Sequence, residues 1–206
     1  MVNLNKIELT KKGQSINLEK KAQLGHITVN LNWNQQTKPS GGFLKSLFGG
    51  GSSGIDLDLG CLFELTTGEK GAIQALGESF GTLLHPPYIE LDGDDRTGTV
   101  SGGENLRING DQLAHIKRIL VYAFIYEGVS NWSEADGVVT ISYPGGQDIV
   151  VRLDEHRNGS NMCAIALIEN VNNETFNVKR LVDYFSGHRK MDEAYNWGLR
   201  WQAGSK

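Results

Sequence analysis

The sequence predicts an all-β fold, a two-sheet antiparallel β-sandwich with acidic loops at one end and little helix. Three observations support this prediction. Apolar and polar residues alternate with a period of two in several short segments, as in half-buried strands. The 206 residues include 26 glycines, many of them between short apolar runs where turns are expected. Few segments show the 3.6-residue spacing of an amphipathic helix.

The composition is that of a globular protein, and we predict a single domain over residues 1–206. Hydrophobic residues make up 39% of the chain and charged residues 21%, which argues against a disordered protein. The net charge of −4 argues against a nucleic-acid partner, because such a protein needs a basic face for the phosphates. The lysine-rich opening lacks the apolar stretch of a signal peptide, and no apolar run is long enough to cross a membrane. We therefore expect a cytoplasmic protein.

The first strands are predicted near the N-terminus. Residues 7–18 contain two short strand candidates on either side of a turn at 11–13. Residues 27–33 then alternate clearly, and β-branched and aromatic side chains on one face predict a half-buried strand. The residues on that face are Ile27, Val29, Leu31 and Trp33.

Residues 39–54 interrupt the strand pattern with a flexible insertion rich in glycine and serine. Four apolar residues inside it have helical spacing, enough for a short amphipathic segment that needs a surface to dock on. We favour docking onto the sandwich itself, and the alternative is docking onto a partner protein or a membrane surface. These residues are Phe43, Leu44, Leu47 and Phe48.

Residues 54–59 alternate again and predict a strand with Ile55, Leu57 and Leu59 facing inward. Asp56 and Asp58 then share the opposite face, about 7 Å apart along the strand. Aspartate is a poor strand former, so we interpret this pair as cation ligands, and a solvated polar face is the alternative.

The rest of the chain predicts further strands and two short helical stretches. Residues 118–126 are almost continuously apolar, which indicates a central strand covered on both faces. The segments 137–143 and 148–153 form a hairpin around a Pro-Gly-Gly turn. The remaining strand predictions are 61–66, 88–91, 162–168 and 175–178, with a helical turn at 111–116, an ambiguous segment at 72–80, and a short helix plus an edge segment within 180–201.

Residues 92–105 form the most informative stretch, because acidic residues crowd together among glycines. Crowded carboxylates repel each other unless water or a cation lies among them, and glycine lets the backbone point oxygens at one centre. Oxygen ligands of this kind suit Ca²⁺ first and Mg²⁺ second. The spacing does not match an EF-hand, so we predict a calcium site in a β-loop, completed by residues elsewhere. The predicted metal ligands are Asp56, Asp58, Asp92, Asp94, Asp95, Glu104 and Asn105.

Several motifs, taken together with their order and spacing along the chain, resemble those of the TerD-domain family of tellurium-resistance and stress-response proteins. They are KGQSINL at 12–18, ITVNLNW at 27–33, IDLD at 55–58, SGGENL at 101–106 and ILVYAFIY at 119–126. The tail NWGLRW at 196–201 looks closer to the TerA branch than to TerD itself. The resemblance implies a calcium-binding β-sandwich that works with other tellurite-resistance or stress-complex proteins. Its Asp-x-Asp and acidic-glycine motifs match Asp56, Asp58 and 92–105. This chain has NWN at 32–34 where the family usually has Gly-Trp-Asp.

No catalytic constellation is visible in the sequence, so we expect a protein that is not an enzyme. The five histidines show no zinc-binding spacing, and the serine after Gly98 falls outside the nucleophile-elbow pattern. The leading hypothesis is a cytosolic calcium-binding interaction module. A metal-independent scaffold is the second hypothesis, and a thiol- or metal-dependent enzyme acting on oxyanions is the third. The third requires an accessible Cys61 or Cys163, whereas buried reduced thiols are the favoured interpretation.

Overall fold

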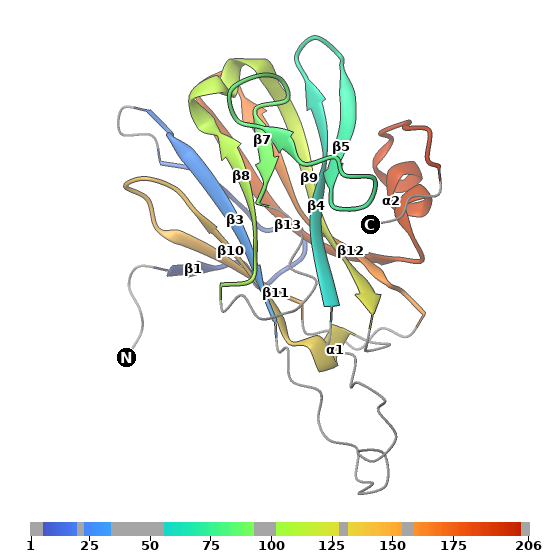
Figure 1. The fold of residues 1–206 in the computed structure, drawn as a ribbon. Coiled ribbons are helices and arrows are strands. Elements are labelled where there is room, and N and C mark those ends of the chain that lie inside the picture. Colours follow the sequence, from blue (N-terminus) through green and yellow to red (C-terminus); the bar gives the residue numbers. More distant parts are fainter. Residues whose placement is uncertain are drawn as a thin grey trace, which may run out of the picture.

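The computed structural model describes residues 6–19, 23–33, 56–92, 102–127, 132–153 and 159–202. Two β-sheets pack face to face, as the sequence predicts (Figure 1). Helices are short: a 3-10 helix covers Gly110–His115, α1 covers Trp132–Ala135 and α2 covers His188–Tyr195. The all-β sandwich prediction is therefore confirmed.

The seven-stranded sheet has the order β1-β11-β10-β3-β8-β7-β6. All of its pairs are antiparallel except β1 with β11. Its strands are β1 (Lys6–Glu8), β3 (His26–Asn32), β6 (Gly81–Thr82), β7 (Ile89–Leu91), β8 (Glu104–Asn109), β10 (Gly137–Ser142) and β11 (Asp148–Leu153).

The six-stranded sheet has the order β2-β13-β12-β9-β4-β5 and is antiparallel throughout. Its strands are β2 (Ser15–Asn17), β4 (Asp56–Leu65), β5 (Lys70–Gln74), β9 (Ile116–Glu127), β12 (Met162–Val171) and β13 (Thr175–Phe185).

The main core lies between the two sheets and follows the predicted alternation. Ile27, Val29 and Leu31 of β3 are fully buried in it, and Leu57 and Leu59 of β4 belong to the same cluster. Burying side chains of this size stabilises the fold by about 1.5–3 kcal/mol each. The period-two pattern therefore identifies the inward faces of β3 and β4 correctly.

β9 is a central strand with both faces covered, as its apolar run indicates. Ile119 and Val121 belong to the core between the sheets, whereas Leu120 and Tyr122 belong to a second cluster on the outer face of the six-stranded sheet. The C-terminal segment, residues 188–202, lies over this outer face (Figure 1). Met191 and Trp197 of this segment are buried there.

Buried Asp192 of α2 fixes the shape of the C-terminal segment. Its carboxylate accepts hydrogen bonds from the backbone N–H of Gly198 (2.8 Å) and of Leu199 (3.0 Å), and from Nε1 of Trp201 (3.0 Å). Hydrogen bonds to a charged group contribute about 1.5–3 kcal/mol each. One carboxylate thus folds residues 198–201 back against the helix.

Some predicted elements differ from the structure in extent. The strand predicted at 175–178 continues to Phe185, and α2 follows it directly. Residues 180–185 of the predicted tail therefore belong to β13, which lies inside the sheet and not at its edge. The insertion 39–54, with Phe43, Leu44, Leu47 and Phe48, lies outside the described residues. No helix in the described part of the chain is long and apolar enough to cross a membrane.

Candidate functional site

The structure describes five of the seven predicted metal ligands. Glu104 begins β8 in the seven-stranded sheet, and Asp58 lies on β4 in the six-stranded sheet. Asp94 and Asp95 lie outside the described residues, as does the acidic loop from 93 to 101.

The side chain of Glu104 connects the two sheets. It is only 3% exposed, and its Oε2 accepts a hydrogen bond of 2.6 Å from the backbone N–H of Leu59 on β4. The pairing of β4 with β5 runs only from Gly60 to Glu64, so Leu59 lies beyond the stretch that β5 covers. A carboxylate from β8 is therefore held at the edge of β4, beside the residue that follows Asp58.

Asp58 is fully buried, which excludes the alternative of a solvated polar face. Asp56, two residues earlier, is half-buried. Leu57 and Leu59 face the core between the sheets, so Asp58 lies on the outer face of the six-stranded sheet. Burial raises the pKa of Tyr122 on this face, and the charge of Asp58 raises it further.

The conformation of Gly103 positions Glu104 at the start of β8. Gly103 has φ +70°, and a Cβ atom at this position would lie 2.1 Å from the backbone oxygen of Leu31. Only glycine fits both the backbone conformation and the close approach to β3. Gly103 thus has a structural reason to be glycine beside the one inferred from the sequence.

Asp92 and Asn105 lie on a different surface from Glu104. Leu106 and Ile108 face the core, so Asn105 and Arg107 face outward from the seven-stranded sheet. The guanidinium of Arg107 forms an ion pair with Asp92 and a longer one of 3.5 Å with Glu90.

Asn30, which the sequence analysis did not single out, holds Asn105 in place on this outer surface. Its Nδ2 donates to Oδ1 of Asn105 at 2.9 Å and to the backbone oxygen of Gly102 at 2.6 Å. Asn30 occupies a polar position in the alternating segment 27–33, and this position is what could have identified it from the sequence. Among the described residues, no three His, Cys, Asp or Glu side chains gather closely enough to hold a metal ion.

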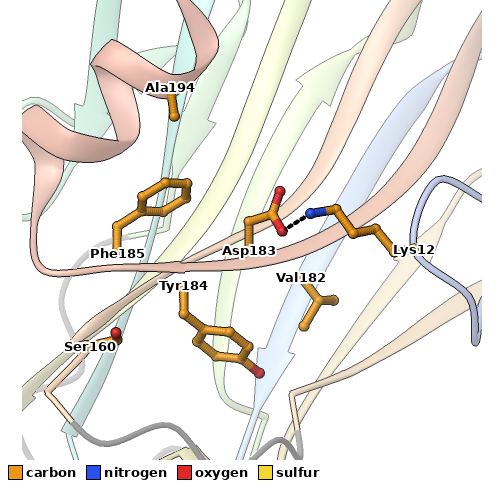
Figure 2. Close-up of a pocket in the computed structure, with 7 residues that line it drawn as sticks. All are labelled: Lys12, Ser160, Val182, Asp183, Tyr184, Phe185 and Ala194. Carbon is orange, nitrogen blue, oxygen red and sulfur yellow. Dashed lines mark hydrogen bonds and ion pairs between the residues drawn. The ribbon is translucent and has the colours of Figure 1, made fainter.

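A cleft of about 430 Å³ lies beside β13 and was also missed from the sequence (Figure 2). Lys12 forms an ion pair with Asp183 at this cleft, and the hydroxyl of Tyr195 donates to the other oxygen of Asp183 at 2.7 Å. The side chains of Asp183 and Phe185 point to one side of the strand and Tyr184 to the other (Figure 2). Both carboxylate oxygens of Asp183 therefore have partners within the protein, and the charge of Asp183 is already paired with Lys12 rather than available to a ligand.

A bulge shapes β13 next to this cleft. Between the pairs Ala164–Asp183 and Ala166–Arg180, β12 has one residue and β13 has two. Val182, one of these two, has φ +55°, a left-handed conformation that a β-branched residue rarely adopts. The bulge explains why the sequence pattern weakens after residue 178.

The two cysteines are free and fully buried, as predicted. Burial strongly raises the pKa of the Cys61 thiol, so this group is protonated at neutral pH. The hypothesis of an enzyme acting on oxyanions requires one of these thiols to be accessible. Neither thiol is accessible in the folded state.

The fold matches that of two solved structures. A homologue of the telluride resistance protein TerD from Streptomyces coelicolor A3(2) superposes with a TM-score of 0.56 at 16% identity, over 82% of this chain and 95% of that protein. A protein of unknown function superposes with a TM-score of 0.59 at 11% identity, over 87% of this chain and 100% of that protein. The chain therefore has the same β-sandwich fold as these two proteins.

Sequence comparison is more specific, although no protein-family model matches the chain. The chain is 46% identical over 205 residues to the tellurium resistance protein TerA from an Alcaligenes species. The match covers 100% of the chain and 60% of that relative, so the chain spans about three fifths of the relative's length. The chain belongs to the TerD-domain tellurium-resistance family.

Proposed function

We propose that the chain is a calcium-binding interaction module of a tellurite-resistance or stress-response system. It would act in the cytoplasm with other proteins of that system. The observation that supports the proposal is the pair of buried carboxylates, Asp58 and Glu104, at one end of β4. Burying negative charge is unfavourable, and a divalent cation beside these carboxylates would reduce this cost.

The donor chemistry of these residues fits a hard cation. Carboxylate oxygens are the ligands that Ca²⁺ prefers, and Mg²⁺ is the second choice. Asp58 and Glu104 would hold the ion, with Asp56 two residues before Asp58 on the same strand. The remaining oxygens would come from the acidic loop, with Asp94 and Asp95 as candidates. Bound calcium would supply positive charge at this end of the sandwich.

The two other predicted ligands are less suited to this ion. Asp92 is engaged by Arg107 and Asn105 by Asn30, on the outward face of the seven-stranded sheet. A ligand set centred on Asp58 and Glu104 therefore excludes them. In this proposal calcium joins the ends of β4 and β8 and orders the nearby loop, which then presents a surface to a partner protein.

Thermal unfolding with and without calcium tests the proposal. Calcium at about one hundred times its dissociation constant should stabilise the protein by about 2.7 kcal/mol. Asp58→Asn and Glu104→Gln should abolish the shift. Glu64→Gln is the matched control, because Glu64 is another buried carboxylate on β4, but it is paired with Lys117 and Arg118. This variant should lose stability and keep the calcium shift. An unchanged melting temperature of the wild type in calcium and in magnesium would rule the proposal out.

A metal-independent scaffold is the second candidate function. The contacts of Asp92 with Arg107 and of Asn105 with Asn30 favour it, because they stabilise residues on either side of the acidic loop without a metal. In this case the contacts with partners would come from Phe43, Leu44, Leu47 and Phe48. Loss of complex formation on deleting residues 43–48, together with indifference to calcium, would support the scaffold.

A further inference from the structure

A second cleft of about 430 Å³ lies where the C-terminal segment passes the turn after β5, and we call it the tail cleft. Its size is within the range of small-molecule sites. Three of its lining residues come from the end of β5 and the turn after it, and four come from the C-terminal segment. They are Gln74, Leu76 and Gly77, and His188, Arg200, Trp201 and Gln202.

Aromatic rings form one wall of the tail cleft. The rings of His188 and Trp201 lie 4.7 Å apart between centroids and are tilted by 40°. The rings of Tyr122 and Phe124 on the sheet contact the His188 ring edge to face, with centroid distances of 5.5 and 5.4 Å. The indole of Trp201 is fixed through its Nε1, which donates to Asp192. An aromatic wall is thus held in place before any ligand arrives.

The part of the cleft that β5 and its following turn supply is also fixed by internal hydrogen bonds. Gln74 accepts from the hydroxyl of Tyr122 at 2.5 Å and donates from Nε2 to the backbone oxygen of Leu76 at 3.1 Å. Leu76 packs against the outer cluster of the six-stranded sheet. The two parts of the cleft are therefore built from the sheet and from the C-terminal segment, and both are held in place.

The charge of the tail cleft is positive. Arg200 is exposed and makes no hydrogen bond or ion pair with any residue that the structure describes, whereas no described lining residue is acidic. Asp192, the carboxylate that Trp201 contacts, does not line the cleft and already accepts hydrogen bonds from Gly198, Leu199 and Trp201. Arg200 is therefore available to an anion.

His188 adds a polar group that internal contacts do not explain. Its Nε2 is buried and has no hydrogen-bond partner among the described residues. Burial lowers the pKa of His188 to about 4, so the imidazole is neutral at pH 7. A phenylalanine would fill the same aromatic cluster without burying a polar nitrogen. An imidazole here is more useful beside a polar ligand than as a packing group.

We propose that the tail cleft binds a small aromatic carboxylate. The ligand's ring packs between Leu76 and the wall formed by His188 and Trp201, and its carboxylate faces the guanidinium of Arg200. Planar guanidinium and planar carboxylate match in geometry as well as in charge. The site is separate from the acidic pair on β4 and does not depend on calcium.

Nuclear magnetic resonance titration of the full chain tests this proposal with benzoate as the probe. The indole N–H signal of Trp201, assigned with Trp201→Phe, should shift saturably with benzoate. Benzamide, the neutral isostere, should bind at least about tenfold more weakly, which corresponds to about 1.4 kcal/mol. No saturable shift with benzoate, or equal binding of benzamide, would overturn the proposal.

Two arginine variants separate a specific site from general attraction to a basic surface. Arg200→Gln should weaken benzoate binding about tenfold, and the exposure of Arg200 means that the fold should be unaffected. Arg189→Gln is the matched control, because Arg189 is also exposed and contacts the backbone oxygen of Trp201 at 3.4 Å but does not line the cleft. It should change the affinity by less than about twofold. Equal effects of both variants would show non-specific attraction and refute the assignment.

Discussion

Arg118 of β9 lies over the indole ring of Trp197, with its guanidinium carbon 3.9 Å from the ring centroid. The same guanidinium donates to Oε2 of Glu64 at 2.6 Å and to the backbone oxygen of Tyr195 at 3.3 Å. Trp197 in turn donates from Nε1 to the backbone oxygen of Phe63 at 3.0 Å. One arginine therefore joins the six-stranded sheet to the C-terminal segment.

Replacing Arg118 by lysine should show how much this junction contributes. Lysine keeps the charge but loses the planar stack on Trp197 and the fork of donors, so we expect the free energy of unfolding to fall by about 1–3 kcal/mol. Urea unfolding followed by tryptophan fluorescence measures the change. Lys117→Gln is the control, because Lys117 also pairs with Glu64 but is more than half exposed, and its loss should matter less. An Arg118→Lys variant as stable as the wild type would contradict this role.

Glu64 should make the stability of the protein depend on acid pH. Burial by itself raises the pKa of Glu64, but hydrogen bonds from Lys117 and Arg118 outweigh it and lower the pKa below its usual value of 4.5. The folded state thus favours the carboxylate. Its contribution is complete above the unfolded pKa and is lost as the pH falls through the lower pKa of the folded state. Urea unfolding at a series of pH values from 7 to 3 measures this loss of stability. In the Glu64→Gln variant the free energy of unfolding should fall less steeply as the pH is lowered. If the variant loses stability just as steeply between pH 7 and pH 3, groups other than Glu64 cause the pH dependence.

The neighbouring glycines 102 and 103 should respond very differently to alanine. Gly103→Ala places a Cβ atom against the backbone of Leu31 in a left-handed conformation, so we expect a loss of about 2–4 kcal/mol. Gly102→Ala meets nothing within 4 Å and should change stability by less than about 0.5 kcal/mol. Thermal unfolding of both variants gives the comparison. Equal losses would mean that the close approach to β3 is not what requires glycine.

Cys61 and Cys163 should resist thiol reagents in the native protein. Both side chains are fully buried, so a water-soluble disulfide reagent should react with them only when the protein opens. In denaturant, two thiols per chain should react at once, since both cysteines are free. Rapid labelling of either cysteine without denaturant would revive the hypothesis of a thiol-dependent enzyme.

The sequence predicts the sandwich because most of its strands have one buried and one polar face. Segment 27–33 and the central run 118–126 are both found as strands with the faces expected for them. The end of β13 was not predicted, because the bulge at Val182 interrupts the alternation and polar Asp183 follows it. A local backbone irregularity of this kind is decided by neighbouring strands and leaves no periodic signal.

The candidate site was predicted less completely than the fold. Acidic composition identifies Asp58 and Glu104 as unusual, but it does not reveal that Glu104 reaches the backbone of Leu59 on the other sheet. It also groups Glu104 with Asn105, although neighbouring residues of a strand face opposite sides. The tail cleft could not be predicted, because it depends on how residues 188–202 fold over a distant part of the chain.

The late position of the C-terminal segment has a consequence for biosynthesis. Leu62, Leu120 and Tyr122 are translated well before Met191 and Trp197, which cover them. A nascent chain that has completed β13 therefore still presents an uncovered apolar surface to solvent or to a chaperone. Ribosome stalling or proteolytic trimming before residue 188 would leave that surface exposed and the product prone to self-association.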